Sequence, residues 1–368
     1  MTVGPIIADS SIIICAGSGG VGKTTTAAAI GIAAARAGRR VVVVTIDPAK
    51  RLADTLGISG KLGNEPHRIE LGSGETGQLW AMMLDTQETF NEVVRHYSAD
   101  SEQVKRITSN RFFLNISNNL SGTQEYMAAE KLFQLHSDDR FDLVVIDTPP
   151  SRDALNFLDA PSRLMRFLDH RVYRMLLAPT TGGLRVISAA MQPLLRTIAG
   201  VVSAKALDDV LDFFRAFEGM ESGFRARASE VAGLLRSPST AYVVITSPSV
   251  EAIEEAEYFI GQLAAAQLSI SALIVNRLQP SFDESAALEN RDPTFNYSAL
   301  DENLKNLNAR STLQLAGVAQ LVDRVAPAPV AFVPLLSQDV ASPDALGVIA
   351  THVIATHVIA NQARTSGL

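Results

Sequence analysis

The chain has 368 residues, with 32 Lys and Arg against 39 Asp and Glu and a formal net charge of −7. Because 47% of the residues are hydrophobic and only 19% are charged, the chain can bury a large core and lacks the composition of a disordered protein. The chain is weakly acidic and has no Lys/Arg run, so we do not expect it to bind nucleic acid. No apolar stretch reaches the roughly 18 residues of a membrane span, so we expect a cytoplasmic protein without stable membrane insertion.

Six short runs rich in Val, Ile and Leu predict strands that are buried on both faces of a parallel sheet. In chain order they are residues 11–15, 41–46, 143–147, 241–246, 271–276 and 330–333, with a weaker seventh at 79–84. Helical patterns lie between most of these runs, the clearest over residues 24–37, which Gly38 ends. The alternation of strand and helix predicts an α/β fold with a doubly wound, mostly parallel sheet.

Two intervals are too long for a single crossover helix. Residues 86–138 and 152–236 carry apolar side chains at helical spacing and almost no strand pattern. We therefore predict one domain over residues 1–368, whose two inserts form a helical subdomain at one edge of the sheet. The methionines of the second insert fit either an ordinary bundle core or a surface that accepts varied apolar partners.

Two segments near the C-terminus carry weaker signals. Polar residues dominate positions 283–310, which we interpret as an excursion over the surface. The tandem repeat THVIATHVIA at 351–360 predicts a plain terminal helix.

A glycine-rich segment, residues 17–24, connects the first strand to the first long helix. It satisfies G-x-x-x-x-G-K-[ST], in which glycines let backbone N–H groups turn inward around a phosphate. Lys23 would reach the β- and γ-phosphates, and the Thr24 hydroxyl would ligate Mg²⁺. The residues expected to bind the nucleotide here are Gly19, Gly20, Val21, Gly22, Lys23, Thr24 and Thr25.

A dinucleotide fingerprint competes for the same glycines. Gly17, Gly19 and Gly22 fit G-x-G-x-x-G, and Asp47 lies near where a ribose-binding acid would be. Such a loop does not need a cation and a hydroxyl directly after its third glycine, whereas a nucleoside triphosphate with Mg²⁺ needs both. The Lys-Thr pair therefore favours the P-loop of a nucleoside triphosphatase.

Two acids follow predicted strands. Asp147 ends one apolar strand, where an acid beside a P-loop contacts Mg²⁺ through its water shell, and Asp47 follows another. Because the carboxyl ends of parallel strands lie at one edge of a sheet, we expect both carboxylates in one crevice.

Several segments together resemble the deviant P-loop ATPases of the arsenite-pump type, which include the ATPase that targets tail-anchored membrane proteins. The segments are the glycine-rich loop, DPAKRLADTLG from Asp47, DTPPSRDAL from Asp147, GTQEYM from Gly122, IVNR ending at Arg277, and PLL from Pro334 with Asp339. Their order and spacing match that family over most of the chain.

The resemblance implies roles for individual residues. Asp47 would be the switch I acid that positions the attacking water, and Asp147 the switch II acid that senses the γ-phosphate. The expected catalytic residues are then Asp47, Lys23 and Asp147, and the expected residues around the metal are Thr24, Asp47 and Asp147. By the same similarity, Asn276, Arg277 and Pro334 would lie on the adenine side of a bound ATP.

The resemblance also implies partners. Members of this family work as dimers, so we expect a homodimer or a heterodimer with a related ATPase subunit. Their helical subdomains present a surface for a client, which here would be a hydrophobic protein. A positioning ATPase of the ParA/MinD kind and an ATP-binding regulatory subunit of a heteromeric ATPase remain alternatives.

Three departures from the family pattern matter. Ser18 stands where the loop usually has a lysine that crosses to the partner's phosphates, which favours slow hydrolysis by a homodimer. Lys50 and Arg51 replace the usual His and Asn of switch I, either as compensating cations or as exposed surface. With Cys15 as its one cysteine, the chain cannot form a CxxC zinc clasp or an arsenite-binding thiolate cluster.

Overall fold

The computed structural model describes residues 2–47, 51–58, 60, 62–71, 76–111, 113–114, 123–149, 151–170, 204–283 and 296–355. Its contacts group into two compact units. The sheet unit consists of Met1–Leu84, Leu135–Leu155 and Arg236–Leu368, and the helical unit consists of Asp85–Gln134 and Asn156–Leu235.

The described residues of the sheet unit form one eight-stranded sheet in the order β3-β4-β2-β5-β1-β6-β7-β8. The strands are β1 (Ile12–Gly17), β2 (Arg40–Thr45), β3 (His67–Ile69), β4 (Gln78–Met83), β5 (Leu143–Asp147), β6 (Thr240–Thr246), β7 (Ala272–Leu278) and β8 (Val330–Pro334). All neighbours pair in parallel except β3, which is antiparallel to β4. The prediction of a doubly wound, mostly parallel sheet is confirmed, with β3 as an edge strand that the sequence patterns missed.

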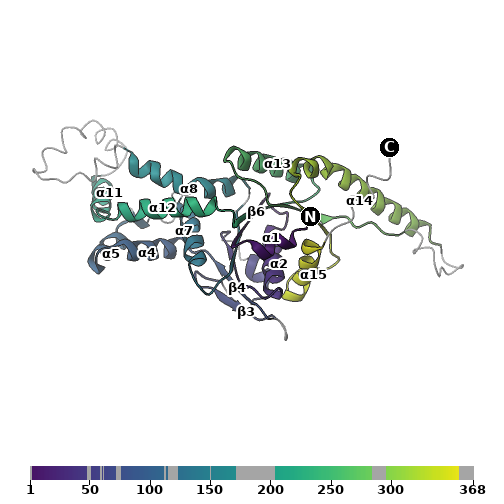
Figure 1. The fold of residues 1–368 in the computed structure, drawn as a ribbon, viewed down its shortest axis with the longest axis horizontal. Coiled ribbons are helices and arrows are strands. Elements are labelled where there is room, and N and C mark those ends of the chain that lie inside the picture. The colour runs from purple at the N-terminus through teal and green to yellow at the C-terminus, as the bar shows by residue number, and fades with distance from the viewer. Residues whose placement is uncertain are drawn as a thin grey trace, which may run out of the picture. The chain divides into compact units, whose positions relative to one another are not determined.

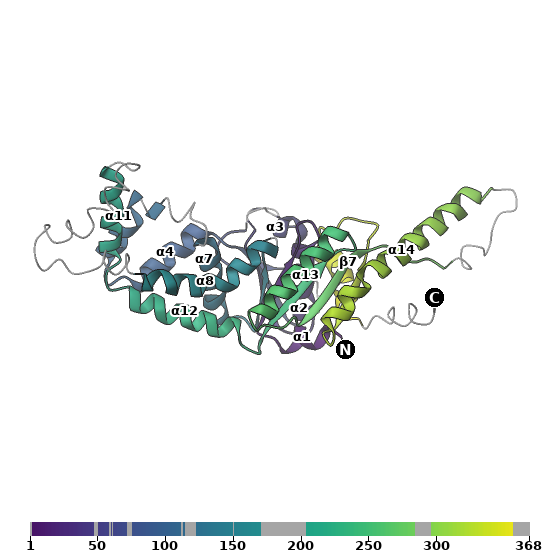
Figure 2. The same ribbon diagram turned by 90° about the horizontal axis from the view of Figure 1, so that it is seen from above.

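Helices cover both faces of this sheet (Figures 1 and 2). They are α1 (Gly4–Asp9), α2 (Lys23–Arg36), α3 (Arg51–Thr55), α13 (Val250–Ala265), α14 (Ser298–Val325) and α15 (Pro343–Ile354). The second half of the surface excursion expected over residues 283–310 is helical, because residues 298–310 begin α14, and most of these residues are exposed. Helical spacing is present in this segment, at Leu300, Leu304 and Leu307. The side chains around them are polar, because most of residues 298–310 are exposed.

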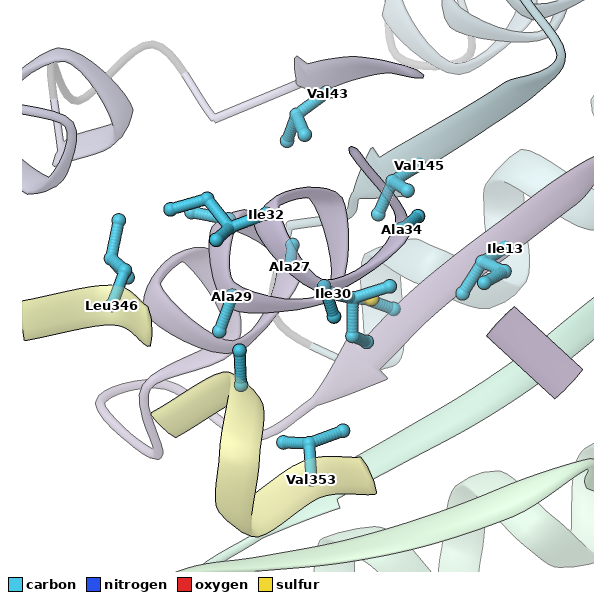
Figure 3. Close-up of a cluster of buried hydrophobic side chains, with 14 of the residues drawn as sticks. Ile13, Ala27, Ala29, Ile30, Ile32, Ala34, Val43, Val145, Leu346 and Val353 are labelled. Atoms are coloured by element: carbon cyan, nitrogen blue, oxygen red, sulfur yellow. The ribbon is translucent and has the colours of Figure 1, made fainter. Parts of the chain in front are cut away.

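The core of the sheet unit is built around α2. Most residues of this helix are Ala, Gly, Ile or Thr, so the helix axis approaches the sheet closely. A methyl group at Gly31 would lie 2.5 Å from Cγ2 of Val43, which requires glycine at that position. On its other side α2 packs against α15, whose Leu346 and Val353 are fully buried (Figure 3).

Every element that the structure describes within the helical unit is a helix. These are α4 (Thr86–Tyr97), α5 (Ser101–Thr108), α7 (Thr123–His136), α8 (Ser151–Asp169), α11 (Ala204–Ala216) and α12 (Glu221–Leu235), of which α7 and α8 also include residues of the sheet unit. Aromatic side chains dominate the core of this unit, among them Phe90, Phe113, Phe213, Phe217 and Phe224. None of the described helices is long and apolar enough to span a membrane.

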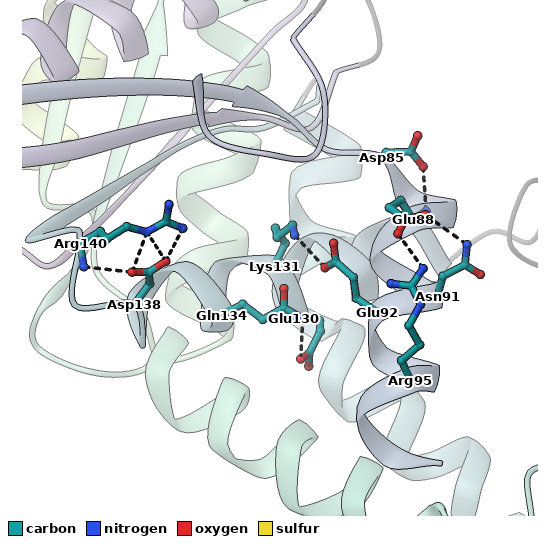
Figure 4. A network of polar contacts seen from close by, with 10 residues as sticks. All are labelled: Asp85, Glu88, Asn91, Glu92, Arg95, Glu130, Lys131, Gln134, Asp138 and Arg140. Atoms are coloured by element: carbon teal, nitrogen blue, oxygen red, sulfur yellow. Dashed lines mark hydrogen bonds and ion pairs between the residues drawn. The ribbon is translucent and has the colours of Figure 1, made fainter. Parts of the chain in front are cut away.

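Polar contacts join the helices of this unit as well. Lys131 of α7 donates to Glu92 of α4 at 2.8 Å, and Arg95 pairs with Glu88 along α4 (Figure 4). Glu130 is 1% exposed, and burial raises the pKa of its carboxyl above the usual range. The unit therefore holds an ionisable carboxyl inside a largely apolar bundle.

Helix α15 offers a matched pair of substitutions that tests this packing. Leu346→Ala removes a side chain with no exposed surface and should lower the free energy of unfolding by about 2–5 kcal/mol. Val348→Ala, on the same helix but 48% exposed, should change it by less than about 0.5 kcal/mol. Urea unfolding followed by the fluorescence of Trp80, the one tryptophan and a residue of β4, would measure both; equal effects would contradict the packing of α15 on α2.

Candidate nucleotide-binding site

The glycine-rich loop runs from the end of β1 into the first residue of α2. Gly22, directly before the helix, has φ +90°, and a side-chain carbon there would lie 2.4 Å from Nδ2 of Asn276. Only glycine meets both conditions. Lys23 begins α2, is 9% exposed, and donates from Nζ to the Ser18 carbonyl at 2.8 Å.

A pocket of about 360 Å³ opens above this loop. Its lining consists of Gly19, Gly20, Gly22, Lys23, Thr24, Thr25, Asp47, Asp54, Thr55, Thr148 and Arg277. The N-terminus of a 14-residue helix and a lysine ammonium therefore face the same space, and this combination favours a bound polyphosphate.

Asp147 lies at the end of β5, directly behind Thr24. Its Oδ2 accepts two hydrogen bonds, from the Thr24 hydroxyl at 2.7 Å and from the Thr45 hydroxyl at 2.9 Å. Its Oδ1 is buried and accepts no hydrogen bond among the described residues. Burial raises the pKa of this carboxyl from 3.8 to about 6, against the lowering effect of the two hydroxyls and of Lys23.

The donor set at this point fits a divalent cation. A carboxylate oxygen without a hydrogen-bond donor, beside a threonine hydroxyl at the start of a helix, supplies the hard oxygen ligands that Mg²⁺ prefers. The described residues contain no cluster of three His, Cys, Asp or Glu side chains that could hold a metal by themselves. The remaining ligands would have to come from water and phosphate oxygens, which is how Mg²⁺ is usually held in nucleotide sites.

The end of β7 contacts the loop from the other side. Nδ2 of Asn276 donates to the Val21 carbonyl at 2.8 Å, and Oδ1 accepts the backbone N–H of Arg277 at 2.9 Å. The Arg277 guanidinium donates to the Gly20 carbonyl at 2.8 Å. Arg277 has φ +60°, and the pairing of β7 with β8 shifts register between Val275 and Leu278.

The structure brings most of the expected site residues together. Among them, only Val21, Asp147, Asn276 and Pro334 do not line the pocket. Val21 is buried in the loop, Asp147 lies behind Thr24, and Asn276 is held against the Val21 carbonyl. Pro334 ends β8 beside Leu278.

Three lining residues were not anticipated. Thr148 follows Asp147 directly and donates to the Cys15 carbonyl at 2.8 Å, while Asp54 and Thr55 belong to α3. The signal for Thr148 was its position beside an expected site acid. Asp54 and Thr55 reach the pocket because α3 begins soon after Asp47. They lie in the segment from Asp47 that carries the family resemblance, but neither was assigned to the site. Lys50 and the side chain of Arg51 lie outside the described part of the chain.

Comparison with known proteins agrees with this site. A family model described as anion-transporting ATPase matches residues 10–355. The chain is 26% identical over 336 residues to an ATPase GET3 of Rhodotorula glutinis, covering 91% of this chain and 85% of that protein. It is 25% identical over 267 residues to an ATPase get3 of Schizosaccharomyces pombe, covering 72% and 73% of the two chains.

A third relative is a putative arsenical pump-driving ATPase 1 of Aquifex aeolicus, which is 22% identical over 340 residues, with 91% of this chain and 76% of that protein covered. The expected resemblance to ATPases of the arsenite-pump type is thereby confirmed. The family model spans nearly the whole chain, and the glycine-rich loop of the chain opens on a pocket lined by Lys23 and Thr24. The chain therefore belongs to the anion-transporting ATPase family and is an ATP hydrolase.

Proposed function

We propose that this chain hydrolyses ATP with Mg²⁺ at the pocket above the glycine-rich loop and uses the nucleotide cycle to control a client surface on its helical unit. The observation that carries the first part is the free Oδ1 of Asp147 beside the Thr24 hydroxyl, because a buried, unpaired carboxylate oxygen is costly unless a cation or water meets it. Bound there, Mg²⁺ would neutralise negative charge on the phosphates.

Other residues around the pocket would neutralise phosphate charge and orient the attacking water. Lys23 lies where its ammonium can neutralise phosphate charge, and the N–H groups at the start of α2 point toward the same space. Asp47 follows the carboxyl end of β2 and lines the same pocket, where its carboxylate can orient a water for attack. Phosphoryl transfer depends mainly on such positioning and charge stabilisation, so this set is sufficient for slow turnover.

Ser18 limits what the chain can do alone. A serine hydroxyl cannot supply the cation that related loops provide at this position, and a trans cation in phosphoryl transfer is worth about 10³ to 10⁵ in rate. We therefore propose that the chain acts as a dimer, and that a related subunit carrying the lysine is the better partner for fast hydrolysis. A regulatory subunit that binds ATP and hydrolyses little of it is the second candidate, and Ser18 is the residue that favours it.

The helical unit is the proposed client-binding part. In the state described here its apolar side chains are mostly buried, and Leu114, at 39%, is its one large hydrophobic side chain among the described residues that counts as exposed. Binding a hydrophobic client on the described helices would require their rearrangement. A nucleotide can drive that rearrangement only to the extent that it binds the two arrangements with different affinity.

The first prediction separates nucleotide binding from chemistry. Lys23→Ala should abolish measurable ATP binding, because Lys23 is the loop's fixed cation. Asp47→Asn should keep ATP affinity within about tenfold and slow hydrolysis at least about 100-fold, because the amide keeps the shape but loses the charge that orients water. ATP affinity would be measured by isothermal titration and ATP hydrolysis by steady-state assay for both variants. If Asp47→Asn hydrolyses ATP as fast as the wild-type protein, Asp47 has a structural role only.

The second prediction concerns the pH dependence of stability. In the nucleotide-free protein Asp147 keeps its proton up to about pH 6, whereas the unfolded chain loses it near pH 3.8. The native state therefore holds more protons between these values, and stability falls as pH rises through that window. Asp147→Asn cannot ionise and should be more stable than wild type by about 1–3 kcal/mol at pH 8.

At pH 4 that difference should nearly vanish. Urea unfolding of both proteins in EDTA, followed by Trp80 fluorescence, gives the comparison, with hydrolysis assays expected to show the variant inactive. A stability difference that stays the same from pH 4 to pH 8 would show that Asp147 is not a buried, costly charge.

The third prediction tests the client surface. Backbone amides of α11 should change their hydrogen-exchange protection at least about tenfold between the nucleotide-free and ATP-analogue states, because a rearranging helix opens more often than a static one. Lys23→Ala serves as the control, since the analogue should change nothing in a chain that cannot bind it. Identical protection of α11 in wild type with and without the analogue would mean a static bundle.

A further inference from the structure

We propose that Asn276 and Arg277, at the end of β7, are positioning residues that set the direction of two phosphate-facing N–H groups in the glycine-rich loop. They form what we call the β7 brace. The proposal rests on the nucleotide binding proposed above and adds the means by which the loop is held ready for phosphate.

The brace acts through two consecutive carbonyl groups. Arg277 donates to the Gly20 carbonyl and Asn276 donates to the Val21 carbonyl, each at 2.8 Å. In a trans peptide the C=O and the following N–H point in opposite directions. Holding these two carbonyls toward β7 therefore turns the N–H groups of Val21 and Gly22 away from β7.

Those two N–H groups are available for a ligand. Neither donates to any group in the part of the chain that the structure describes. Buried backbone N–H groups are rarely left without an acceptor, and successive N–H groups that turn inward form an anion-binding concavity. Gly20 and Gly22 both have positive φ, the backbone state that such a concavity requires.

The brace is itself held in place. Asn276 accepts the Arg277 N–H with Oδ1 while donating with Nδ2, so one side chain couples both halves of the brace. Arg277 has φ +60°, an uncommon state for a residue other than glycine, and lies where β7 and β8 shift register. Glycine would adopt this backbone state without strain but would lack the guanidinium that donates to Gly20.

The brace also changes the expectation for Asn276. One of the two amide hydrogens and one of the two lone pairs of Oδ1 are used within the protein, so the side chain holds the loop and still has one donor and one acceptor for a base. Removing its donor should therefore weaken the binding of a phosphate chain that has no base.

The test compares nucleotide-free structure and polyphosphate binding in three variants. Arg277→Gly suits φ +60° but removes the guanidinium, Arg277→Lys keeps one charged donor, and Asn276→Asp keeps the acceptor for Arg277 but loses the donor to Val21. Gln267→Gly is the control, because Gln267 also has φ +60° and is exposed after α13. Isothermal titration would use ADP, ATP and inorganic tripolyphosphate, and the ¹⁵N amide signals of Val21 and Gly22 would be recorded without ligand.

We expect Arg277→Gly and Asn276→Asp to weaken ADP and ATP binding by the same factor, about 10-fold to 100-fold, with a comparable loss for tripolyphosphate. Arg277→Lys should recover part of the loss, and Gln267→Gly should bind within about twofold of wild type. Before any ligand is added, the Val21 amide signal should move in Arg277→Gly and the Gly22 amide signal should move in Asn276→Asp.

Three results would overturn the brace. The first is an unchanged Val21 amide signal in Arg277→Gly. The second is a loss confined to ATP, which would indicate direct contact with the γ-phosphate. The third is a loss for Asn276→Asp that disappears with tripolyphosphate, which would indicate base recognition. Failure of wild type to bind ADP at all would instead refute the proposed function, so the two failures are distinguishable.

Discussion

One buried carboxylate joins the elements that meet at the phosphate loop. Asp147 ends β5 and accepts hydrogen bonds from Thr24, at the start of α2, and from Thr45, at the end of β2. A charge at such a depth is tolerated only when its partners are in place, so the two hydroxyls and the carboxylate constrain one another. The positions of α2, β2 and β5 relative to one another and the affinity for a cation therefore both depend on the Asp147 carboxylate.

Much of the fold could be predicted from the sequence because most of its strands are apolar and buried on both faces, so each strand can be recognised without its neighbours. The exceptions have local causes. β3 has three residues, and its His67 and Arg68 are exposed, so neither length nor hydropathy marks it. The first half of α14 is mostly solvated, so its polar composition resembles that of a loop although its leucines keep a helical period.

The site divides in the same way. Its glycine-rich loop is contiguous in sequence, so a motif suffices to find Lys23 and Thr24. The contact between Asn276 and Val21 joins residues 255 positions apart, and resemblance alone assigned that side chain to a base. Asp54 and Thr55 reach the pocket through the path of α3, which depends on tertiary packing. The sequence therefore predicted the residues of a contiguous motif, but it did not predict which distant residues each side chain contacts.

The packing of α15 against α2 has a consequence for how the chain folds during synthesis. α2 is among the first helices to leave the ribosome, yet the helix that covers it is among the last, and Gly4 of α1 approaches Ile354 at the far end of α15. Until then the alanine-rich surface of α2 stays uncovered. Contacts this distant in sequence slow folding and prolong the exposure of apolar surface, so the closing of α15 over α2 completes the sheet unit late.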